Sequence, residues 1–73
     1  MNESEFIKII GDNIVSRRIE LGIKQIDLAT SVGIEDSALR RIEKGKTNPT
    51  AKTLLKIAVA LDVEVSYLVS MNK

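Results

Sequence analysis

Hydrophobic side chains recur along the chain at helical spacing, and no segment alternates polar and apolar residues for the length of a strand. Glycine or proline interrupts this pattern at Gly22, Gly33, Gly45 and Pro49. We therefore predict an all-α fold without a sheet, formed as a single domain over residues 1–73. Its five helices are expected at about residues 3–21, 25–31, 35–44, 51–61 and 64–71.

Each expected helix has one apolar face that would form the core. The residues expected to face inward are Ile7, Ile10, Ile14, Leu21, Ile26, Leu28, Ala29, Val32, Leu39, Ile42, Leu54, Leu55, Ala58, Leu61, Val65, Leu68 and Val69. Asn2 and Glu5 have the spacing of a capping box at the start of the first helix. Gly22 is expected to end that helix, and Thr50 to cap the fourth.

Cysteine and histidine are both absent, which removes disulfides, thiol catalysis, the commonest general base and the commonest zinc ligands. The carboxylates are scattered, without a glycine-rich phosphate loop or metal-ligand spacing. No apolar run approaches the roughly 20 residues that span a bilayer, and the acidic first residues do not resemble a secretory signal. We expect a cytoplasmic protein that is not an enzyme, with no cofactor, no metal and no membrane contact.

The segment from Gln25 to Glu43 predicts two short helices joined by a tight turn. Helices joined so closely bring their backbones together near the corner, which requires a small side chain such as Ala29. The turn needs a residue that tolerates a positive φ, and Gly33 supplies it. The second helix then presents four polar residues on its outer face: Asp36, Ser37, Arg40 and Arg41.

Basic residues are unevenly distributed, although the formal net charge of the chain is only +1. Six of the eleven basic residues lie between Ser37 and Lys56, where Glu43 is the single acid. The segment from Met1 to Asp36 holds four basic and seven acidic residues. A basic helix followed by a basic loop predicts that a phosphate backbone lies against this part of the chain.

Together these features resemble the helix-turn-helix DNA-binding domain of the phage repressor and Cro family, also called the XRE family. The resemblance extends from about Ile10 to Leu68 and includes the flanking motifs Ile42-Glu43-Lys44-Gly45, Asn48-Pro49-Thr50 and Ala60-Leu61-Asp62-Val63. It implies a lambda-repressor-like fold, in which a helix-turn-helix unit over about residues 25–44 places its second helix in the major groove of DNA.

The resemblance also implies roles for individual residues. Base edges would be read by Asp36, Ser37, Arg40 and Arg41, with Arg40 or Arg41 on guanine and Asp36 on the N4 amine of cytosine. Phosphate contacts would come from Lys24, Gln25, Lys44, Lys46, Thr47 and Asn48. Glu35 departs from the family, which often has a small hydroxyl residue there, and it is expected to cap the second helix poorly.

Arg18 and Glu43 both lie on the apolar side of their expected helices. A charge on a buried face must be paired, because its desolvation is otherwise unfavourable by several kcal/mol, by order of magnitude. The family has an arginine–glutamate ion pair at these two positions. We therefore assign Arg18 and Glu43 to a structural ion pair rather than to catalysis.

The implied function is that of a sequence-specific transcriptional regulator, which binds a palindromic operator as a homodimer. Double-stranded DNA and a second copy of the chain are the expected partners, and RNA polymerase is a further candidate. The chain resembles restriction–modification controllers, Cro-like phage repressors and antitoxins, and its N-terminal segment looks most like that of a controller. The alternative is a protein-interaction module that kept the fold without DNA binding, which the acidic Glu35-Asp36 step favours.

The last expected helix, at about residues 64–71, offers a candidate dimer interface. Its apolar residues cannot all face the core of one small domain, and aromatic residues and methionine are favoured at interface centres. The expected interface residues are Val65, Tyr67, Leu68, Val69 and Met71. Alternatively, this helix only completes the core of the monomer.

Overall fold

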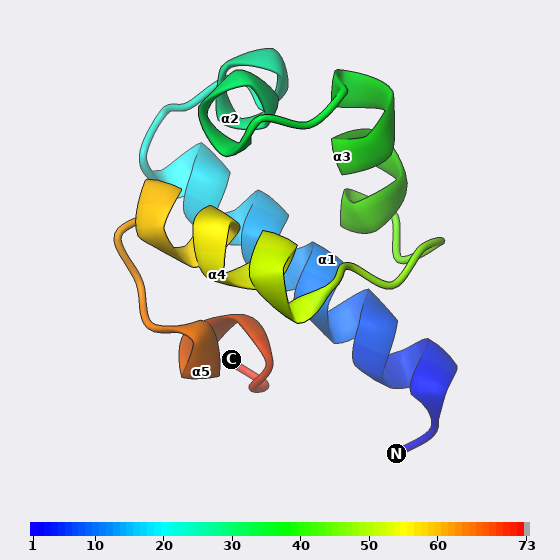
Figure 1. The fold of residues 1–73 in the computed structure, drawn as a ribbon. Coiled ribbons are helices and arrows are strands. Elements are labelled where there is room, and N and C mark those ends of the chain that lie inside the picture. Colours follow the sequence, from blue (N-terminus) through cyan, green and yellow to red (C-terminus); the bar gives the residue numbers. More distant parts are fainter. Residues whose placement is uncertain (73) are drawn as a thin grey trace.

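A computed structural model describes residues 1–72, which fold into five helices (Figure 1). These helices are α1 (Glu3–Glu20), α2 (Gln25–Val32), α3 (Asp36–Glu43), α4 (Ala51–Ala60) and α5 (Val65–Leu68). Over residues 1–72 the structure contains no strand, so the all-α prediction is confirmed. The predicted bounds of the first four helices lie within one residue of those observed, but α5 is a single turn and ends before the expected position.

The long helix α1 lies behind α4 in Figure 1, with α2 and α3 at one end of the molecule and α5 at the other. α1 contacts α3 and α5, α2 contacts α3 and α4, and α4 also contacts α5. Fully buried aliphatic residues fill the space between them: Ile10, Ile14, Leu28, Leu39, Ile57, Leu61 and Leu68. None of the helices in the described part of the chain has the length and apolar character of a membrane span.

The predicted local signals start and stop the helices. Asn2 Oδ1 accepts from the N–H of Glu5 at 2.8 Å, and Glu5 Oε1 accepts from the N–H of Asn2 at 3.2 Å, which completes the capping box. Thr50 Oγ1 accepts from the N–H of Thr53 at 3.1 Å and caps α4. Gly33 follows α2 with a φ of +80°, the left-handed conformation that the turn requires.

Three residues predicted to face the core are exposed instead. Leu21 lies just after α1, where the chain turns away from the core. Ile26 lies on the side of α2 opposite Leu28, because two residues correspond to a rotation of about 200° in a helix. Leu55 is likewise opposite Ile57, which is fully buried and was not predicted. Only Lys52, Thr53 and Lys56 are polar in α4, so its apolar side is wide and the sequence does not define which apolar residues face inward.

α1 crosses the end of α3 at Gly11, a contact that the sequence analysis did not identify. Gly11 is buried, and a Cβ atom placed there would lie 2.6 Å from the carbonyl oxygens of both Ile42 and Glu43. These oxygens belong to the backbone of α3 and can move away only if the helix itself shifts. A residue without a side chain is therefore needed for the close approach of α1 and α3.

Two polar side chains of α1 cap the ends of α5 and α4, and neither was predicted to do so. The buried Asn13 donates from Nδ2 to the carbonyl oxygens of Leu68, at 3.0 Å, and Ser70, at 2.6 Å. Arg17 Nε donates to the carbonyl oxygen of Leu61 at 2.9 Å. The last carbonyl groups of a helix have no partner within it, so α1 satisfies acceptors that the short C-terminal elements leave open.

We predict that Gly11→Ala destabilises the protein, because the added methyl group overlaps the backbone of α3. The expected net loss is about 1–3 kcal/mol in the free energy of unfolding, even though alanine has the higher helix propensity. Urea denaturation measures this difference. Ser16→Ala, at an exposed position of α1, is the matched control and should change stability little. Equal stability of the Gly11→Ala variant and the wild type would contradict the assigned role of Gly11.

Candidate nucleic-acid interface

α2 and α3 form the predicted helix-turn-helix corner. Ala29 is buried at this corner, and its carbonyl oxygen accepts from the N–H groups of Gly33 and Ile34 at 2.9 and 3.1 Å. The pair is held against the core by the buried residues Leu28, Val32, Leu39 and Ile42. The corner therefore has a fixed inner side, and the opposite face of α3 remains available to a ligand.

The four polar residues predicted on the outer face of α3 lie in two neighbouring rows. Helical spacing places Ser37 and Arg41 in one row, and Asp36, Arg40 and Lys44 in the other. Arg40 and Arg41 are exposed, whereas Asp36 and Ser37 are half-buried. Arg40 Nη2 donates to Asp36 Oδ2 at 3.4 Å. Glu35 precedes α3 without a side-chain cap, as its residue type predicts.

Most of the predicted phosphate contacts are exposed and lie in loops next to α3. They are Lys24 before α2, and Lys44, Lys46, Thr47 and Asn48 between α3 and α4. Gln25 is half-buried, and its Nε2 donates to Glu43 Oε1 at 2.8 Å. This hydrogen bond holds the start of α2 beside the end of α3. Lys24 precedes Gln25, and Lys44 follows Glu43. The hydrogen bond therefore brings these two lysines to the same region of the surface.

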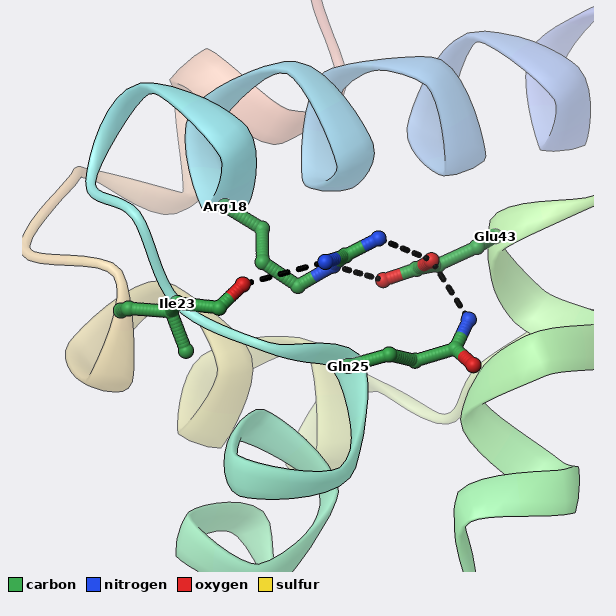
Figure 2. A network of polar contacts seen from close by, with 4 residues as sticks. All are labelled: Arg18, Ile23, Gln25 and Glu43. Carbon is green, nitrogen blue, oxygen red and sulfur yellow. Dashed lines mark hydrogen bonds and ion pairs between the residues drawn. The ribbon is translucent and has the colours of Figure 1, made fainter.

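Figure 2 shows the polar network that fixes this junction. Arg18 Nε and Nη2 donate to the two carboxylate oxygens of Glu43 at 2.8 and 3.1 Å, and Arg18 Nη1 donates to the carbonyl oxygen of Ile23 at 3.0 Å. The side chains of Arg18 and Glu43 are only 15% and 4% exposed. The predicted ion pair is therefore present, and it connects α1 to α3. Gln25 keeps a second N–H of its amide for another acceptor.

Of the five residues predicted at the dimer interface, one is buried in the core. Leu68 is 0% exposed and fills the core, so its place in a dimer interface was wrongly predicted. A single helical turn has one inward position, and Leu68 occupies it. Val65, Tyr67 and Val69 are half-buried, and Met71 is exposed beyond the end of α5.

Exposed apolar surface continues from this region onto α4, which the sequence analysis did not foresee. Leu55 and Val59 lie four residues apart on one side of α4 and are 56% and 72% exposed. They line a groove between α4 and the start of α5, together with Val63, Val65 and the two acids Asp62 and Glu64. The molecule thus has a polar and basic surface around α3 and a separate apolar surface along α4 and α5.

Comparison with known proteins is consistent with this arrangement. A sequence model of the family HTH_3, described as helix-turn-helix, matches residues 14–68. An HTH-type transcriptional regulator of Haemophilus influenzae is 36% identical over 68 residues, which cover 93% of this chain and 69% of that protein. Repressor protein C2 of Salmonella phage P22 is 33% identical over 61 residues, which cover 84% of this chain and 28% of the repressor.

Solved structures also match the whole arrangement of helices. The restriction-modification controller protein C.AhdI of Aeromonas hydrophila has a TM-score of 0.81 and 31% sequence identity, over 85% of this chain and 94% of that protein. A hypothetical transcription factor of Neisseria has the same fold, with a TM-score of 0.86 and 23% identity over 96% of this chain. The predicted resemblance to phage repressors and their relatives is confirmed by these matches.

We predict that Glu43→Ala destabilises the fold far more than Arg41→Ala does. Removal of the Glu43 carboxylate leaves Arg18 buried without its ionic partner, which is expected to lower the free energy of unfolding by roughly 3–5 kcal/mol. Arg41 is exposed, and its truncation should change that free energy by only about 0.5 kcal/mol. Thermal melting of the two variants provides the measurement. The same melting temperature for both would show that the ion pair does not stabilise the fold.

Proposed function

Since the chain belongs to the helix-turn-helix family HTH_3 of transcriptional regulators, we propose that it binds a palindromic DNA operator as a homodimer. In this proposal α3 of each subunit enters the major groove of one half-site. The observation that carries the proposal is the outer face of α3, which is polar, basic and accessible while its inner side is fixed to the core. Such a helix can enter a groove without a rearrangement of the domain.

The two sets of polar residues would have different tasks on DNA. Asp36, Ser37, Arg40 and Arg41 are the candidates for contacts to base edges, and these contacts determine sequence preference. Lys24, Gln25, Lys44, Lys46, Thr47 and Asn48 are the candidates for phosphate contacts, and these determine position and general affinity. Contacts to phosphates displace counterions, so binding should weaken steeply as the salt concentration rises.

The proposed homodimer follows from the small number of base pairs that one helix-turn-helix unit can contact. One helix-turn-helix unit reads only a few base pairs, whereas a two-fold dimer reads two half-sites whose centres lie about 34–36 Å apart. The exposed apolar side chains of Leu55 and Val59, in a groove that also contains Val63, Val65, Asp62 and Glu64, support the α4–α5 side as the interface. A two-fold axis there would place the groove of one subunit against that of the other, because such an interface is self-complementary.

Among the regulators that the chain resembles, we favour a restriction–modification controller. The similarity to C.AhdI extends over 94% of that protein at 31% identity, which supports this choice. A Cro-like phage repressor and an antitoxin are the alternatives within the family. Because a regulator of transcription acts where the DNA lies, we place it in the cytoplasm.

A protein-interaction module without DNA binding is the second candidate function. It is favoured by the two acids at the start of α3, Glu35 and Asp36, which line a surface hollow together with the exposed Ile26. Two negative charges close to DNA lower its general affinity for phosphates. Retention on heparin or on random duplex DNA, eluted with a salt gradient, separates the two functions.

We predict that Arg41→Ala and Lys46→Ala weaken DNA binding in different ways. Loss of Arg41 should reduce affinity for the cognate operator by roughly 1–3 kcal/mol and relax one base position. Loss of Lys46 should weaken binding to all duplexes about equally and reduce the dependence on salt. Fluorescence anisotropy with operator and random duplexes, at several salt concentrations, distinguishes these effects. A uniform loss of affinity in both variants would exclude Arg41 from base reading.

We predict that Val59→Asp separates the dimer into monomers. Val59 is 72% exposed, so an aspartate there is tolerated by the monomer but places two charges at an interface that excludes water. Sedimentation should show a shift from dimer to monomer, and binding to a duplex with two half-sites should lose cooperativity. Ser16→Asp, an added charge at an exposed position of α1, is the control. A wild type that stays monomeric at high micromolar concentration and binds DNA without cooperativity contradicts the proposed dimer.

A further inference from the structure

Asp36 and Arg40 form an ion pair within the outer surface of α3. They lie four residues apart, and Arg40 Nη2 donates to Asp36 Oδ2 at 3.4 Å. The side chain of Arg40 is 48% exposed and that of Asp36 is 43% exposed. The pair therefore lies along the edge of the recognition surface, where the guanidinium group is accessible and is also held from one side.

The two side chains differ in their reach and in their capacity for hydrogen bonds. A single methylene group carries the carboxylate of Asp36, whereas three carry the guanidinium group of Arg40. A guanidinium group has five N–H donors, and a bidentate contact to O6 and N7 of guanine uses two of them. Arg40 can therefore contact a guanine and donate to Asp36 at the same time. The carboxylate of Asp36 extends less far from the helix than the guanidinium group of Arg40, so the acid is suited to orient the arginine.

Asp36 is also the acid of α3 that is available to orient Arg40. The other acid of this helix, Glu43, is buried and already accepts from Arg18 and Gln25. An arginine side chain loses much rotational freedom when it binds, and a partner that holds it beforehand reduces this loss. The carboxylate of Asp36 also repels phosphates, so it disfavours DNA on which Arg40 finds no guanine.

We propose that Asp36 is a positioning residue for Arg40, and that the two side chains recognise one G·C base pair as a unit. In this inference Asp36 acts through Arg40, in place of the direct base contact for which it was a candidate above, and the acidic start of α3 increases specificity while it lowers general affinity. This inference rests on the proposed function, because it requires α3 to enter the major groove.

Selection of bound sequences from random duplex DNA tests the inference, with the wild type, Asp36→Ala, Arg40→Ala and the double variant compared. We expect Arg40→Ala to lose the preference for guanine at one position, with a decrease in the ratio of cognate to random affinity of about 5- to 150-fold. Asp36→Ala should relax the same position, bind random duplex more tightly, and add no further loss of preference in the double variant. Asp36→Glu, which can still pair with Arg40 at this spacing, should keep the preference.

Asp27→Ala is the matched control, since Asp27 is an exposed acid in the first turn of the neighbouring α2. This variant changes the net charge equally and should leave every base preference intact. Melting temperatures of all variants should equal that of the wild type. The inference is overturned if Asp36→Ala relaxes a different position from Arg40→Ala, or if either variant retains the full preference. A wild type that enriches no sequence overturns the proposed function itself, and the inference with it.

Discussion

The ion pair between Arg18 and Glu43 is the interaction on which the orientation of α3 depends. Both charges are removed from water, so any packing of α1 against α3 that separates them leaves a buried charge without a partner. The paired arrangement is therefore strongly selected over other registers of the two helices. Because Glu43 also accepts from Gln25, the same carboxylate fixes the start of α2. One buried carboxylate thus determines how both helices of the DNA-binding unit are placed.

α1 connects the helix-turn-helix unit to the other end of the domain, because two different sides of α1 contact different elements. Gly11 and Arg18, seven residues apart, lie on nearly the same side of the helix and face α3. Asn13 and Arg17 lie on a different side and bind the ends of α5 and α4. The surface proposed to read DNA and the apolar surface of α4 and α5 are therefore both attached to α1. In the proposed dimer, this attachment fixes the distance between the two recognition helices.

The sequence predicted those features that depend on local signals, and it failed where distant segments meet. The helix bounds follow from Asn2, Thr50 and the glycines, whose effects lie within a few residues. The ion pair could be predicted because charges on an apolar face need partners and because the resembled family has an arginine–glutamate pair at these positions. Nothing near Gly11 or Asn13 in the sequence indicates which carbonyl groups approach them. Leu55 was wrongly assigned to the buried side of α4 because the apolar side of this helix is wide. The DNA-contacting residues came from family resemblance, and the structure adds their positions on the surface while their contacts with DNA stay predictions.

The separation of the two surfaces has a further consequence for the proposed regulator. A domain of this length buries only about 60% of the surface of its unfolded chain, so Leu55 and Val59 stay exposed rather than contribute to the core. Their burial in a dimer would stabilise the folded state more at higher protein concentration, with a free energy that grows as the logarithm of that concentration, since association favours folded subunits by mass action. Occupancy of a two-half-site operator would then rise more steeply than linearly with concentration. The same exposed residues that add little to the stability of the monomer would thus make the regulator sensitive to its own abundance.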